Sequence, residues 1–228
     1  VVCRDRYAEI VCILAQICTS CERYATEIRN LQRSEIEEVS ESFDSKSQDA
    51  SSTLAQKKNP LTSENICGLA RIVRAFVAPS MENMVLWHER DLTNSSAERF
   101  VVPHVFVLTD DILSKMNQVF ANLVVRRDRM GENIEKANGL IMAESVMMAL
   151  VRKGVGRQEA HEVVRRASLK AEDEGRRLID VISATKEIRS RMTLKEIGEA
   201  MDPEKYVGIA PRIVDEVVAE ARRLVRGG

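Results

Sequence analysis

The stretch YAEIVCILAQICTSCERYATEIRNL, residues 7–31, decides the fold class. Its larger apolar side chains recur in alternating steps of three and four, at Tyr7, Ile10, Leu14, Ile17, Cys21, Tyr24, Ile28 and Leu31. This spacing places them along one face of a long α-helix, and such a seam is stable only when partner helices cover it. The nearby sequence offers too few helices for that. We therefore expect a helical bundle whose further helices come from other subunits, from segments before Val1, or from both.

Composition supports an all-α protein and excludes some functions. The 228 residues are 44% hydrophobic and only 4% aromatic, with few glycines and prolines, which argues against a many-turned β-sandwich or barrel. The 34 basic and 35 acidic residues nearly cancel, so the general footprint of nucleic-acid binding is missing. The sequence shows neither a membrane-spanning stretch nor a signal peptide, so we expect a soluble cytoplasmic protein. It begins in mid-pattern without Met, as part of a longer polypeptide would.

Two further long helices and a smaller domain are predicted. One helix follows Asn59-Pro60 and should kink at Pro79, and the other opens at Ser95-Ser96-Ala97-Glu98, a capping-box sequence. Their apolar positions are Ile66, Leu69, Ala70, Val73, Phe76 and Val77, then Val105, Leu108, Ile112, Met116, Val119 and Leu123. Shorter helical segments follow. We expect a long-helix bundle domain over 1–128 and a small all-helical domain over 129–228, without a sheet.

The cysteines and histidines give little sign of a metal or redox site. The five cysteines are odd in number and mostly occupy helix-spaced apolar positions, as reduced core thiols do. Cys18 and Cys21 form a C-x-x-C, but no second ligand pair lies nearby. None of the three histidines belongs to a metal-binding pair, and only His88 lies close to a cluster that could bind a substrate.

A first candidate cluster is the loop SSTLAQKKNP, residues 51–60, followed by Ser63 and Glu64. Hydroxyls, two cations and a carboxamide could close over an anionic substrate and exclude water from it. The residue types alone also fit a solvated linker before an ordinary helix start. Upstream of the loop lies an acidic run at Glu35, Glu37, Glu38 and Glu41.

A second cluster is WHERDLTNSSAER, residues 87–99. Ser95 and Ser96 fall where free backbone N–H groups of a helix N-terminus point outward, and Arg90 and Arg99 flank them. This is a sensible phosphate site in a chain without overall positive charge. The alternative is a capped helix with two surface arginines.

These clusters resemble a known family. The spacing S-S-x-x-x-x-K-x-N-P, with Ser63-Glu64 after it, is similar to the signature loop of the fumarase/aspartase superfamily. Ala50, Leu54 and Ala55 stand where that signature usually has Gly, Met and Pro. The W-H-E-R-D segment closely resembles that of adenylosuccinate lyases. The segments C-R-D-R-Y-A-E at 3–9, A-T-E-I-R at 25–29 and G-L-A-R at 68–71 also resemble those enzymes.

The resemblance implies a homotetramer that releases fumarate from two nucleotides, adenylosuccinate and the succinyl-carboxamide ribotide of purine synthesis. It implies Ser51 as the base, Lys57 and Asn59 as ligands of the succinyl carboxylates, and Glu64 as the partner of an acid histidine from sequence before Val1. Arg90, Ser95 and Arg99 would hold the phosphate, and Ser52 and Arg4 would also bind substrate. Each active site would draw on three subunits. No metal or organic cofactor is implied, and these 228 residues alone should be inactive.

Two alternatives compete with this interpretation. One is another lyase of the superfamily, above all argininosuccinate lyase, because Gln56-Lys57-Lys58-Asn59-Pro60 also resembles that enzyme's loop. The phosphate cluster counts against it, because argininosuccinate carries no phosphate. The other is a helical scaffold that has lost catalysis, which the altered Ala50, Leu54 and Ala55 would permit.

Overall fold

The computed structural model describes residues 2–42, 59–88 and 90–226. The chain divides into two compact units, Val1–Met130 and Gly131–Gly228. The first contains α1 (Asp5–Leu31), β1 (Val39–Ser40), α2 (Leu61–Ala75), α3 (Val77–Glu82), α4 (Thr93–Ala121) and β2 (Val124–Val125). The unit boundary falls within α5 (Arg127–Lys136). The second contains η1 (Leu140–Met142), α6 (Ala143–Arg152), α7 (Arg157–Asp173), α8 (Leu178–Ala184), α9 (Lys186–Arg189), α10 (Leu194–Ala200), η2 (Pro203–Tyr206) and α11 (Ala210–Arg226). The predicted all-α fold class is confirmed.

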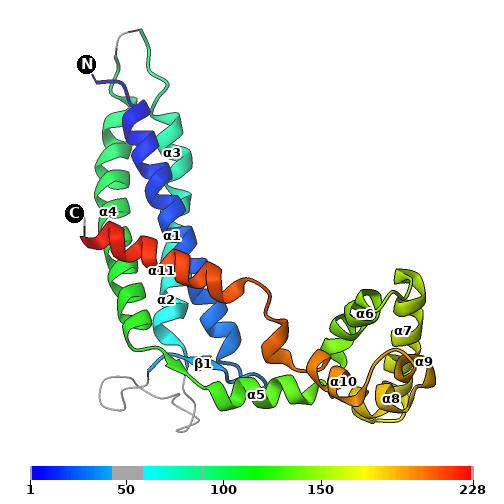
Figure 1. Cartoon of the computed structure of the whole chain (residues 1–228). Helices are drawn as coiled ribbons and strands as arrows, with labels where there is room; N and C mark the ends of the chain where they lie inside the picture. The colour runs from blue at the N-terminus through cyan, green and yellow to red at the C-terminus, as the bar shows by residue number, and fades with distance from the viewer. Residues whose placement is uncertain (1, 43–58, 89, 227–228) are drawn as a thin grey trace. The chain divides into compact units, whose positions relative to one another are not determined.

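The first unit is a bundle in which α1, α2 and α4 run side by side (Figure 1). Its core consists mainly of small and β-branched side chains, which allow the helices to approach closely. From α1 it takes Val11, Ala15, Cys18, Cys21, Ala25 and Ile28, from α2 Ile66, Cys67, Ala70 and Val73, and from α4 Val101, Val105, Ile112, Met116 and Val119. The apolar positions predicted for α2 and α4 are thus confirmed as core or as partly buried residues packed on it.

Helix α1 has a second apolar face, and it carries half of the eight seam residues seen in the sequence. Tyr7, Ile10, Ile17 and Tyr24 remain 36–46% exposed, whereas the small residues one position further along the chain are buried. Within the chain, therefore, α2 and α4 pack on the stripe of small residues. The face of large apolar residues stays open in the described part of the molecule.

Two local predictions, a helix kink and a helix cap, differ from the structure. The kink expected at Pro79 is a helix boundary: α2 ends at Ala75, whose carbonyl is the one that the missing N–H of Pro79 would have bonded. The capping box at Ser95–Glu98 is wrong, because α4 begins earlier, at Thr93. The carboxylate of Glu98 instead accepts hydrogen bonds from Arg4 Nε at 2.6 Å and Asn94 Nδ2 at 2.8 Å.

A short antiparallel pairing of β1 with β2, absent from the prediction, ties the end of α1 to the end of α4. Val39 lies opposite Val125 and Ser40 opposite Val124. The backbone of Arg126 extends the contact, donating to the Glu38 carbonyl at 2.9 Å. This pairing fixes the segment just before residues 43–58 at one end of the bundle (Figure 1).

The second unit has its own core of Val, Leu, Ile and Ala side chains, centred on Val146, Leu150, Leu178, Ile182, Ile188 and Ile197. A complete capping box opens α10, formed by Thr193 and Glu196. In the first unit, all five cysteines are free, and burial raises the pKa of Cys18 and Cys21. Cys3 is exposed rather than part of the core. No helix in the described ranges is both long and apolar enough to span a bilayer.

Candidate functional site

A cavity of about 570 Å³ lies at the end of the bundle where α1 ends and α2 begins. Asn59 and Glu64, both predicted as catalytic residues, line it together with Arg29, Arg33 and Arg126. Residues five positions apart need not line the same cavity. Here the chain turns at Pro60, and Asn59 and Glu64 both line this one. The structure thus brings the two together. Ser51, Ser52 and Lys57 lie outside the described residues.

The first turn of α2 is held by a residue from elsewhere in the sequence. Pro60 is the N-cap and makes no side-chain capping bond. Glu41 replaces it: the carboxylate accepts a hydrogen bond from the Ser63 amide at 2.6 Å and from the Thr62 amide at 3.3 Å. These are the two amides that an N-cap side chain normally satisfies. Glu64 follows directly, with its amide bonded to the Pro60 carbonyl at 2.9 Å.

The cavity is lined by three guanidinium groups and, in equal number, by the carboxylates of Glu37, Glu41 and Glu64, so donors for an anion stand beside acidic groups. Arg126 donates to the Glu37 carbonyl at 3.2 Å, Arg33 to the Asn30 carbonyl at 3.2 Å, and Arg29 faces the Cys67 sulfur at 3.7 Å. In the described ranges, none of the three forms an ion pair with a carboxylate. Sequence reasoning did not select Arg33 or Arg126 and saw Arg29 only within a family segment, because isolated arginines usually face solvent.

The proposed phosphate cluster lies at the other end of α4, and its chemistry differs from the expectation. The carboxylate of Asp91 accepts from the Thr93 amide at 2.9 Å and the Trp87 amide at 3.0 Å, and also from the Thr93 hydroxyl. These bonds, that of the hydroxyl foremost, hold the pKa of Asp91 below its usual value. The Ser95 amide is bonded to the Leu92 carbonyl. Two amides in the first turn of α4, those of Thr93 and Ser95, are thus occupied within the chain.

The side chains available there are those of Arg90, Ser95 and Arg99. Arg90 and Arg99 are exposed and Ser95 is half-buried. Arg4 is engaged: its ion pair with Glu98 joins the start of α1 to α4, and the two side chains are only 13% and 18% exposed. A role of Arg4 in substrate binding would have to use the rest of its guanidinium group.

His88 lies in the same connection, exposed and with a positive φ of 46°. His104 stacks on Phe100 with ring centroids 4.3 Å apart, as expected of a structural histidine. The described ranges contain no group of three or more His, Cys, Asp or Glu side chains arranged to hold a metal ion.

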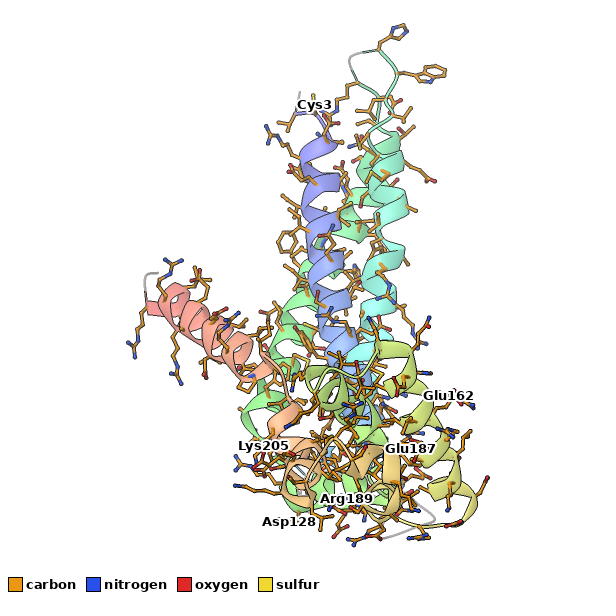
Figure 2. The ribbon with its side chains drawn as sticks, turned by 45° about the vertical axis from the view of Figure 1, so that its right-hand side comes forward. Cys3, Asp128, Glu162, Glu187, Arg189 and Lys205 are labelled. Atoms are coloured by element: carbon orange, nitrogen blue, oxygen red, sulfur yellow. The ribbon has the colours of Figure 1, made fainter. Side chains whose placement is uncertain are left out.

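The two clusters lie at opposite ends of the bundle. Figure 2 shows Cys3 at the end where α1 begins and Asp128, which follows β2, toward the other end of the same unit. Between Glu64 and Arg90 run most of α2 and all of α3, which together extend over about 30 Å at 1.5 Å per residue. A mononucleotide is much shorter than this. One chain therefore cannot apply both clusters to the same substrate molecule.

Two family models match the chain: "Lyase" over residues 1–75 and "Adenylosuccinate lyase C-terminus" over residues 139–217. The adenylosuccinate lyase of Methanothermobacter thermautotrophicus is 47% identical over 98% of this chain and 50% of its own length. That of Methanocaldococcus jannaschii is 44% identical over 96% of this chain and 47% of its own length. The chain thus spans about half the length of these curated relatives.

Solved structures share the fold across different chemistries. A fumarate lyase from Mesorhizobium sp. BNC1 superimposes with a TM-score of 0.85 at 31% identity, over 95% of this chain and 47% of its own. A 3-carboxy-cis,cis-muconate lactonizing enzyme from Pseudomonas putida gives 0.87 at 26% identity, over 98% of this chain and 48% of its own. The fold alone therefore does not distinguish these chemistries. By the family models and the curated relatives, the chain belongs to the adenylosuccinate lyase family of the fumarase/aspartase superfamily.

Proposed function

We propose that the protein eliminates fumarate from adenylosuccinate, giving AMP, and from the succinyl-carboxamide ribotide of purine synthesis. The observation that carries this is the pair of end clusters. Asn59 and Glu64 line a cavity with guanidinium groups that form no ion pair among the described residues, and Arg90, Ser95 and Arg99 stand at the other end of the bundle. Such a substrate needs both, because it carries a dicarboxylate at one end and a phosphate at the other.

In this proposal Ser51 takes a proton from the carbon next to a succinyl carboxylate, and the C–N bond then breaks. The carbanion is costly unless fixed charges stabilise its carboxylate, which is the task of Lys57 and the Asn59 amide. Glu64 makes no ion pair in the described part of the chain, so its carboxylate is available to orient the histidine that protonates the leaving nitrogen. The phosphate grip of Arg90, Ser95 and Arg99 supplies remote binding energy that positions the reacting carbon.

The proposal includes a homotetramer with shared active sites. Two observations support association: the end clusters are too far apart to serve one substrate from one chain, and α1 leaves Tyr7, Ile10, Ile17 and Tyr24 partly exposed on one face. Helices that pack across copies along this face would cover it and would bring unlike ends together.

The test is fumarate release from adenylosuccinate, with argininosuccinate in parallel, by the full-length protein and its Ser51→Ala variant. We expect turnover of the nucleotide alone and its loss in the variant. An Arg99→Gln variant should lose nucleotide turnover mainly through KM. Cleavage of argininosuccinate alone would refute the substrate assignment. No turnover of either by a well-folded oligomer would favour the scaffold that Ala50, Leu54 and Ala55 permit.

A further inference from the structure

Glu41 is a buried carboxylate that the proposed mechanism does not use. It is 8% exposed and lines the cavity that contains Asn59 and Glu64. A carboxylate so far removed from water is costly unless charge-assisted hydrogen bonds replace its hydration. Glu41 obtains them from the amides of Thr62 and Ser63, at the positive end of the α2 dipole.

The backbone of Glu41 is itself fixed. Its amide donates to the side-chain oxygen of Gln32 at 3.1 Å, just past the end of α1, and the preceding Ser40 pairs with Val124 of β2. The carboxylate therefore extends from a segment anchored on both α1 and the α4 end to the first turn of α2. It joins the two stretches that precede and follow residues 43–58.

We propose that Glu41 is a positioning residue for the proposed elimination, acting through the first turn of α2. Thr62 and Ser63 stand between Asn59 and Glu64, so a shift of their amides moves both functional side chains. Pro60 makes no capping bond of its own, and the Ser63 hydroxyl is buried without a partner in the described structure. The turn thus depends on a single carboxylate from a distant segment. The expected effect on turnover rests on the proposed function, whereas the claim that Glu41 holds the first turn of α2 does not.

The test compares Glu41→Gln with Thr193→Ala in the full-length protein. The amide of Gln keeps one acceptor but presents N–H groups to the second backbone amide, so one bond is replaced by a clash of donors. Thr193→Ala is the matched control because it also removes a helix cap, from α10 in the second unit, far from the cavity along the chain. Both variants should lower the melting temperature by a similar amount.

We expect Glu41→Gln to lower kcat about tenfold or more and Thr193→Ala to leave it within about twofold. AMP inhibition, which depends on the phosphate cluster at the other end of the bundle, should stay within about twofold in both. Amide hydrogen exchange of a peptide covering residues 59–66 should become faster only in Glu41→Gln. If that variant folds poorly, Glu41→Asp, which keeps the charge but shortens the reach, should show the same pattern in weaker form.

A kcat of Glu41→Gln within twofold of the unaltered protein would overturn the proposal, and so would an equal loss in Thr193→Ala. If the unaltered protein releases no fumarate, the proposed function fails, and hydrogen exchange then decides the remainder. Unchanged exchange over residues 59–66 would show that Glu41 does not hold the turn, whereas faster exchange confined to Glu41→Gln would show that it does.

Discussion

Mixing two inactive variants should restore activity if the end clusters of one site come from different chains. One variant carries Glu64→Gln and the other carries Arg90→Gln with Arg99→Gln. Each loses a charge that the proposed mechanism requires, and loss of a charged hydrogen bond of about 3 kcal/mol lowers turnover roughly a hundredfold. After unfolding and refolding together in equal amounts, half of the chains supply an intact cavity end and half an intact phosphate end. Random assembly then gives about one quarter of the sites both intact ends.

The assay is fumarate release from the mixture at subsaturating adenylosuccinate, compared with each variant alone and with unaltered protein treated alike. The matched control mixes Glu64→Gln with Asn59→Leu. Both lie at the cavity end of the same chain, so no site can draw that end intact, and no recovery is expected. Recovery near one quarter in the first mixture and none in the second would match the opposite placement of the clusters. No recovery in mixed oligomers shown to have formed would refute it.

Three other predictions concern association, the core and pH. Ile13→Asp, on the open face of α1, should lower the oligomer mass measured by light scattering, whereas Gln158→Asp adds the same charge in α7 and should not. Ile112→Ala, at a fully buried position, should destabilise the protein by about 2–5 kcal/mol in chemical denaturation. A hydrogen bond from Lys153, followed by those from Thr193, lowers the pKa of Glu196 from 4.5 to about 2. Because the folded pKa is depressed, the stability difference between unaltered protein and a Lys153→Met variant should be full at neutral pH and should disappear as pH falls from 4.5 toward 2.

Much of the fold could be predicted because the helices carry strong periodicity. The apolar positions of α2 and α4, from Ile66 to Val119, were read correctly. In α1 the same signal was ambiguous, because its large apolar residues and its small ones each recur with a helical period. The predicted seam therefore mixes outer-face residues such as Tyr24 with core residues such as Ile28, and only the neighbours in space show that the chain also buries Ala15 and Ala25.

The candidate site was less accessible to sequence reasoning. Glu41 closes an acidic run with Glu35, Glu37 and Glu38, and nothing in the run distinguishes the residue whose carboxylate reaches α2. The position of the Glu41 carboxylate depends on the pairing of β1 with β2, and strands of two residues leave no recognisable pattern in the sequence. The separation of the clusters, in contrast, could have been predicted: the helical residues between Glu64 and Arg90 already imply about 30 Å.

The bundle also explains how one fold can serve different chemistries. Its core of Ile, Val, Ala and Cys packs the helices and does not determine the reaction. Solved structures with this fold include a fumarate lyase and a lactonizing enzyme. In the proposed function, the distinguishing residues stand at the two ends: Asn59 and Glu64 act in the elimination, and Arg90 and Arg99 bind the substrate phosphate. Because long helices separate the ends, a change at one need not disturb the packing of the other. Association of copies would then bring the two end clusters, from different chains, into one active site. Oligomerisation would therefore be required for catalysis.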